Sequence, residues 1–302
     1  MNWFFLALIA MLFWSGSDLF SKIGSKPDDK YSHWKMVMAV GLVMGVHAGY
    51  MVFFEGVPIT WSAIIQYLPA SILYILSMVM GYVGLRYIEL SISSPICNCS
   101  GAAAALFCLI FLGQTLNVPQ IFAVLAMAAG VVMLGIVETR EDEAIKLERR
   151  KAENVQYAKS FLALLLPILY CIIDAAGTVA DSIILETLDE DVANVAYELT
   201  FLFMGVVSAV YVLIIKRQSL MPKREGPKLV AAVCETAGQL AYVYAIAANA
   251  VGAAPIISCY CLVSVLWSRI FLREKLSWKH YLAIGIAAVG IVIMGVMDEL
   301  PG

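Results

Sequence analysis

Long apolar stretches separated by short polar connections run along the whole chain. Each apolar window of about 20 residues is long enough to cross the hydrocarbon core of a bilayer as a helix. The apolar positions are continuous rather than alternating, which favours helices over the strands of a membrane β-barrel. The pattern predicts ten spans, at residues 2–21, 35–54, 68–87, 93–112, 119–138, 161–180, 194–213, 229–248, 252–271 and 279–298.

Composition supports this interpretation and excludes most other classes. Of 302 residues, 62% are hydrophobic and 14% are charged, whereas a soluble domain is about half apolar and about a quarter charged. A water-soluble fold, a disordered chain, a coiled coil and a nucleic-acid-binding domain are therefore excluded for the chain as a whole. The net charge of −3 gives no indication of a polyanionic partner. We expect an all-α polytopic membrane protein with ten transmembrane helices.

No sequence motif indicates a metal, a cofactor or catalysis. The seven cysteines lie in apolar stretches, where thiols behave as small apolar side chains. A P-loop, HExxH and GxSxG are all absent from the sequence, which disfavours direct use of ATP and an integral membrane enzyme. The N-terminus lacks the basic region of a cleavable signal peptide. We expect no cofactor, no metal and no enzymatic activity.

Charged residues predict the orientation in the membrane. With ten spans, all 20 lysines and arginines fall on one side of the bilayer, and acids such as Glu55, Asp189 and Asp191 fall on the other. Basic loops are retained in the cytoplasm. We therefore expect both termini to be extracellular and residues 139–159 (TREDEAIKLERRKAENVQYAK) to form a charged cytoplasmic linker in a multi-pass protein of the cell membrane.

The two halves of the chain resemble each other at a constant offset of 160 residues. The predicted domains are a five-helix repeat at 1–138, the linker at 139–159 and a second five-helix repeat at 160–302. An odd number of spans inverts the second copy relative to the first. Inverted repeats around a midplane site are typical of transporters that work by alternating access. Matching pairs are Tyr82-Val83 with Tyr242-Val243, Pro95-Ile96 with Pro255-Ile256, Cys99 with Cys259, and Gly130 with Gly290.

Three segments resemble a known family. They are Phe13-Trp14-Ser15-Gly16-Ser17-Asp18, the pattern from Pro95 through FLGQTL to Gly130, and its second copy from Pro255 through FLREKL to Gly290. Together they are similar to the EamA-type transporters of the drug/metabolite transporter (DMT) superfamily, over nearly the whole chain. The resemblance implies two inverted five-helix repeats and a central pathway lined by the first, third, fourth, sixth, eighth and ninth helices.

The chain departs from that family in two ways. The acidic-basic pair expected after the fourth helix is replaced by Gly113-Gln114-Thr115, whereas the second copy keeps Arg273-Glu274-Lys275. The charge distribution also places the termini outside, whereas many relatives are expected to have them inside. Family members transport amino acids, nucleobases, organic cations, sugars and other metabolites, so the resemblance does not select a substrate.

Polar residues within the spans are the candidate functional groups. An ionisable side chain near the bilayer centre costs about 2.5–3.5 kcal/mol on insertion scales, so it usually faces the bundle interior. Glu235, Gln239 and Tyr242 share one helix face, and Glu235 is the leading candidate for binding a proton or a cation. The candidates for substrate binding or coupling are Glu235, Gln239, Tyr242, Asp174, Thr178, Trp14, Asp18, Tyr82, Asn98 and Tyr260.

Structural roles are the alternatives for several of these residues. Glu235 and Asp174 can equally serve in hydrogen bonds or ion pairs between helices. Asp18 lies one turn from Lys22, with which it can form an intrahelical pair. We interpret His47 as a packing residue of a peripheral helix rather than a proton relay, and we expect Glu198 to reach outward to the membrane interface.

The favoured function is secondary transport of a small metabolite, with an organic cation, an amine or an amino acid as the favoured substrate and protons as the candidate coupling ion. The alternatives are a multidrug exporter of lipophilic cations and a membrane scaffold or sensor that does not transport. The expected partners are a small-molecule substrate and the lipid bilayer, without nucleic acid. The chain is expected to act as a monomer or a homodimer.

Overall fold

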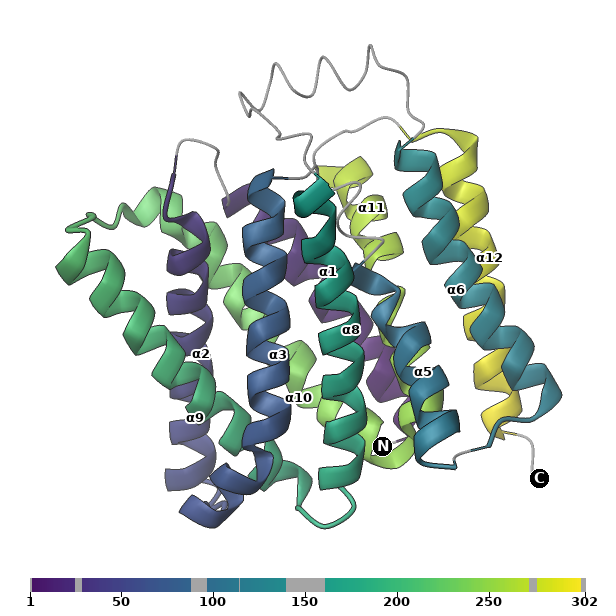
Figure 1. Ribbon diagram of the computed structural model, residues 1–302, viewed down its shortest axis with the longest axis horizontal. Helices are drawn as coiled ribbons and strands as arrows, with labels where there is room; N and C mark the ends of the chain where they lie inside the picture. Colours follow the sequence, from purple (N-terminus) through teal and green to yellow (C-terminus); the bar gives the residue numbers. More distant parts are fainter. Residues whose placement is uncertain are drawn as a thin grey trace.

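Every regular element in the described part of the computed structural model is a helix (Figure 1). That part comprises residues 2–24, 29–87, 97–113, 115–139, 161–271 and 276–299. The helices are α1 (Trp3–Gly24), α2 (Ser32–Phe53), α3 (Trp61–Tyr87), α5 (Ser100–Phe111), α6 (Val118–Thr139), α8 (Phe161–Ile184), α9 (Glu190–Ala209), the π-helical η1 (Val210–Ile215), α10 (Pro222–Ser258), α11 (Tyr260–Phe271) and α12 (Trp278–Glu299).

Eight helical segments in this part of the chain are long and apolar enough to cross a membrane, and α5 is a shorter apolar helix. Large apolar side chains cover the outside of the bundle: Phe53 is 84% exposed and Trp61 is 80% exposed. A soluble monomer rarely exposes so much apolar surface. The prediction of an all-helical, multi-pass membrane protein is therefore confirmed.

Several predictions fall on residues that are not described. The linker at 139–159 lies outside the described residues, except for Thr139 at the end of α6. Pro95 and the charged triplet at 273–275 also lie outside them. Within the described residues, the span predicted at 68–87 begins earlier, at Trp61, because the polar Gln66 lowers the local hydropathy without interrupting α3.

The backbone of α10 breaks at Asn249, whose φ of −162° and ψ of 83° are not helical. The Asn249 Oδ1 atom accepts a hydrogen bond of 3.1 Å from the Gly252 N–H, as an N-cap does for the helical turn that follows. Contacts with α1 show that the chain reverses its direction here. Their order along the chain is Lys228 with Gly24, Gly238 with Trp14, Gly252 with Trp3, and then Trp267 with Ser15.

Glycines bring pairs of helices from the two halves into close contact. A Cβ atom added at Gly41 of α2 would lie 2.8 Å from the Gly205 Cα atom of α9. Between α6 and α12, a Cβ atom at Gly130 would lie 2.7 Å from the Ala287 Cβ atom, and one at Gly290 would lie 2.8 Å from the Met127 Cγ atom. Small residues allow such close backbone approach between helices in a membrane.

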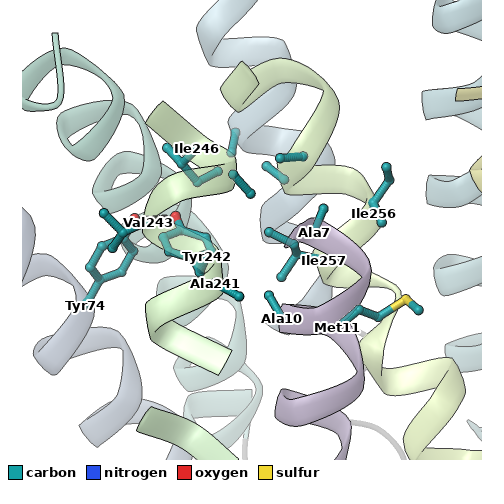
Figure 2. Close-up of a cluster of buried hydrophobic side chains, with 14 of the residues drawn as sticks. Ala7, Ala10, Met11, Tyr74, Ala241, Tyr242, Val243, Ile246, Ile256 and Ile257 are labelled. Carbon is teal, nitrogen blue, oxygen red and sulfur yellow. Dashed lines mark hydrogen bonds between the residues drawn. The ribbon is translucent and has the colours of Figure 1, made fainter. Parts of the chain in front are cut away.

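The centre of the bundle is formed by α1 and α10. Ala7, Ala10 and Met11 of α1 lie beside Ile256 and Ile257 of α10, in the cluster of buried side chains that Figure 2 shows. The first part of α10 adds Tyr242, Val243 and Ile246 to the same cluster. The parts of α10 before and after Asn249 therefore both pack against α1. This packing positions the polar side chains of α1 and α10 that are described next.

Candidate functional site

A cavity of about 150 Å³ lies inside the bundle. Its walls come mainly from α1, α3, α8 and α10. Further contributions come from Cys97, Asn98, the first two residues of α5, Tyr197 of α9 and Tyr260 of α11. Three carboxylic acids line it, Asp18, Asp174 and Glu235, whereas no lysine, arginine or histidine is found among its described lining. The cavity is therefore acidic and aromatic in character.

The structure brings together nine of the ten residues singled out from the sequence. These are Trp14, Asp18, Asn98, Asp174, Thr178, Glu235, Gln239, Tyr242 and Tyr260, all of which line the cavity. The tenth, Tyr82, belongs to α3, and its side chain lies outside the described part of the chain. Tyr74 also lines the cavity and was not among the residues predicted from the sequence. A signal was present, because Tyr67, Tyr74 and Gly81 follow one another at intervals of seven residues and therefore share one face of a helix.

Glu235 is held by two side chains of α1. The Ser17 hydroxyl donates a hydrogen bond of 2.7 Å to Glu235 Oε2, and the Trp14 indole N–H donates one of 3.4 Å to the main-chain oxygen of Glu235. Within the described residues Glu235 forms no ion pair. The carboxylate therefore lines the cavity in a defined orientation without a basic partner.

Gln239 and Asp174 add further polar groups to the cavity wall. The side chain of Gln239 is 3% exposed, and its Nε2 atom has no hydrogen-bond partner among the described residues. A buried donor without a partner is costly, so a bound molecule that accepts its hydrogen bond would gain from it. Asp174 accepts a hydrogen bond of 3.2 Å from the Ser77 hydroxyl.

Three aromatic rings form one corner of the cavity. Trp14 stacks on Tyr242 with ring centroids 5.0 Å apart, and it meets the edge of Tyr260 at 6.1 Å. Gly238 is required beside this corner, because a Cβ atom there would overlap the Trp14 indole. Faces of such rings attract organic cations.

The expectation that Glu198 reaches outward was wrong. Its side chain is fully buried, and its Oε1 atom lies 2.7 Å from Nδ1 of His47 on α2. The close packing of α2 on α9 places the imidazole next to the carboxylate, so an internal partner replaces water. Neither residue lines the cavity.

Comparison with known proteins identifies the family. The model of the EamA-like transporter family matches residues 1–136 and again residues 161–296. One solved crystal structure aligns with a TM-score of 0.69 at 16% sequence identity, covering 98% of this chain and 96% of that chain, which shows a shared fold. No curated protein sequence matches the chain. Because the two family matches cover almost the entire sequence in two copies, the chain belongs to the EamA-like transporter family of the DMT superfamily.

Proposed function

We propose that this protein is a secondary transporter that moves a small organic cation, an amine or an amino acid across the cell membrane by alternating access. The observation that carries this proposal is the cavity lined by Asp18, Asp174 and Glu235 without a basic residue in its described lining. Carboxylates and aromatic faces together favour a positively charged ligand. An anionic substrate would meet repulsion from the same groups.

Gln239 favours an amine that also carries an acceptor group. Its Nε2 atom has no partner in the part of the chain that the structure describes, and Gln239 follows Glu235 by one turn on the same face of α10. An ammonium group near Glu235 and a carboxylate or hydroxyl near Gln239 would satisfy both side chains. Amino acids have this combination of groups, whereas lipophilic cations lack the acceptor, so the multidrug exporter remains the second candidate.

We further propose ten membrane crossings in two inverted repeats, at 1–138 and 160–302, joined by the linker at 139–159. The reversal at Asn249 supports two crossings within the stretch from α10 to α11. Corresponding helices of the two halves pair in opposite directions: His47 lies beside Glu198, and Gly41 lies beside Gly205. The start of α1 and the end of α12 lie at the same end of the bundle (Figure 1), which is consistent with an even number of crossings.

The proposed orientation places the basic ends of the helices in the cytoplasm and both termini outside. The cavity lining extends along α1 from Trp14 to Ser21, toward the basic end of that helix. At the opposite end, the next buried groups are Tyr67 and Asp181, which do not line the cavity. The described lining therefore supports a site that lies nearer the proposed cytoplasmic end of the bundle than the outer end.

A thermal-stability screen of the purified protein tests the substrate class. Amines, amino acids, nucleosides, sugars and lipophilic cations would be compared, because a ligand at 100 times its Kd adds about 2.7 kcal/mol. We expect amines or amino acids to stabilise the wild type and Glu235→Gln to lose the response. The matched control, Glu186→Gln, changes an exposed carboxylate on the loop after α8 and should respond as the wild type does.

Two results would contradict the proposal. Stabilisation by sugars or anions alone would exclude the cationic substrate class, and an unchanged response of Glu235→Gln would assign that residue a structural role. Flux of the stabilising compound into proteoliposomes then separates a transporter from a scaffold or sensor, since only a transporter accumulates it inside the vesicles.

A further inference from the structure

Asp181 is a fully buried carboxylic acid that lies next to the cavity without lining it. It follows Thr178 by one turn on α8. The Tyr67 hydroxyl donates a hydrogen bond of 2.7 Å to its Oδ1 atom, and the Tyr74 hydroxyl lies 3.3 Å from its Oδ2 atom. Within the described residues Asp181 forms no ion pair. A buried charge without a counter-charge is costly, so this acid calls for a specific explanation.

A chain of hydroxyl groups connects Asp181 with the cavity wall. The Tyr74 hydroxyl of α3 contacts the Tyr242 hydroxyl of α10 (Figure 2). The Tyr242 hydroxyl lies 3.1 Å from Thr178 Oγ1, and Thr178 Oγ1 lies 3.2 Å from the main-chain oxygen of Asp174. Tyr74, Tyr242 and Thr178 all line the cavity. The buried acid is thus linked to the cavity by three hydroxyls in series.

Counting hydrogens shows that this chain depends on the protonation of Asp181. It has four contacts, from Asp181 Oδ2 to the Asp174 carbonyl, and three hydroxyl hydrogens to fill them. Each hydroxyl donates once. When Asp181 is ionised, Tyr74 donates to it, Tyr242 donates to Thr178 and Thr178 donates to the Asp174 carbonyl, so the contact between Tyr74 and Tyr242 lacks a hydrogen. A proton on Oδ2 supplies the fourth hydrogen, and all four donors then point away from Asp181.

Among the described residues, the groups around Asp181 offer no alternative counter-charge. Tyr67 and Tyr74 face it from α3, Tyr242 lies one hydroxyl further on α10, and Tyr197 of α9 meets the Tyr74 ring edge-on at 6.1 Å. On α8 itself, the nearest titratable group toward the cavity is another acid, Asp174. Four phenols and a carboxylic acid thus surround it. Because none of these groups is positively charged, a bound proton is what neutralises Asp181.

We propose that Asp181 binds and releases a proton during the transport cycle, and that Tyr74 and Tyr242 transmit its protonation state to the substrate cavity. This inference rests on the proposed transport function and assigns its coupling residue. A proton that joins the Tyr242 oxygen from the cavity moves on to the Tyr74 oxygen, and Tyr74 passes its own hydrogen to Asp181 Oδ2, while the hydrogen of Tyr242 stays on its contact with Thr178. One O–H bond forms at Asp181, one breaks at the donor in the cavity, and both phenols end unchanged.

The change in direction of the Tyr74 hydrogen reaches the aromatic corner of the site. When Asp181 is ionised the Tyr74 hydroxyl donates to it, and when Asp181 is protonated Tyr74 donates to the Tyr242 oxygen instead. The ring of Tyr242 stacks on Trp14, and we expect the substrate to bind against this pair of rings. Substrate and proton therefore act on the same tyrosine, which gives a physical basis for coupling them.

Infrared difference spectroscopy of the purified full-length protein, recorded between acidic and alkaline buffer without added substrate, tests the proposal. We expect a carboxylic acid C=O band in the wild type that is lost in Asp181→Asn. Asp174→Asn is the matched control on the same helix, and it should retain that band. Tyr74→Phe removes one hydroxyl that contacts Asp181 while keeping the ring, so the band should shift in frequency rather than disappear.

Retention of every wild-type band in Asp181→Asn would overturn the proton site. An unshifted Asp181 band in Tyr74→Phe would overturn the connection to the cavity, and this variant also serves if Asp181→Asn does not elute as a folded protein. The measurement requires neither substrate nor flux. A failed substrate screen with the Asp181 band present therefore contradicts the proposed function alone, and the reverse result contradicts only the proton site.

Discussion

The Trp14 indole lies against the Tyr242 ring at a centroid distance of 5.0 Å, with the two planes inclined by 30°. Trp14 belongs to the first half of the sequence and Tyr242 to the second. The indole also donates to the main-chain oxygen of Glu235, one of the three acids of the cavity. The aromatic corner and the acidic wall are therefore joined, and both exist only where the two halves meet.

This stack predicts a specific loss of affinity. Trp14→Leu should weaken binding of organic ammonium compounds by about 2- to 30-fold, because a cation–π contact contributes about 0.5–2 kcal/mol. Trp14→Phe should lose less, since it keeps an aromatic face. Titration of the purified variants gives the Kd values. Trp61→Leu, which changes an exposed ring outside the cavity, should bind as the wild type does, and equal affinity of all variants would contradict the aromatic site.

The contact between α2 and α9 predicts opposite effects for two glycines on one helix. At Gly41 a Cβ atom would lie 2.7 Å from the main-chain oxygen of Phe201, so Gly41→Ala should destabilise the protein by about 1–3 kcal/mol. At Gly49 a Cβ atom meets nothing within 4 Å, so Gly49→Ala should leave stability unchanged or raise it by up to about 1 kcal/mol. Thermal unfolding in detergent distinguishes the two variants. Equal midpoints would show that α2 can move away from α9 at little cost.

The buried His47–Glu198 pair predicts an asymmetry between single and double variants. Glu198→Ala should cost about 3 kcal/mol, the lower end of the range for a buried pair that loses one partner, because the His47 side chain is 26% exposed. Replacing both residues by apolar ones, as in His47→Phe with Glu198→Leu, should recover part of that loss. Unfolding midpoints of the wild type, Glu198→Ala and the double variant give the comparison. A double variant less stable than Glu198→Ala would contradict this account.

The charge distribution predicts which loops face the cell exterior. Glu186 and Gln218 are exposed at opposite ends of the bundle, on the acidic and the basic side respectively. In intact cells, a membrane-impermeant maleimide should label Glu186→Cys, whereas Gln218→Cys should react only after permeabilisation. The wild type gives the background from its native cysteines, which are buried or half-buried where the structure describes them. The opposite labelling pattern would reverse the proposed orientation.

Nine of the residues singled out from the sequence line the cavity, because a polar side chain in an apolar helix is costly to expose to lipid. Glu235 and Asp174 could be assigned to the bundle interior from their cost in lipid alone. Their partners could not be assigned, since Ser17 and Glu235 are separated by 218 positions and nothing in either helix specifies the match. The same limit applied to Glu198, whose partner His47 lies on a different helix. Helix faces follow from periodicity, whereas pairings follow from packing.

Gly130 lies against Ala283 and Ala287, and its counterpart Gly290 lies against Ala123 and Met127, the sequence counterparts of those two alanines. Each half of the chain thus restricts the mutations that the other half tolerates at the matching position. A larger side chain gained on α6 requires a smaller one on α12, and the reverse. We therefore expect the two copies to have diverged by paired changes at the contact between α6 and α12. Replacing one half of this chain with the matching half of a relative should then require replacing the other half as well.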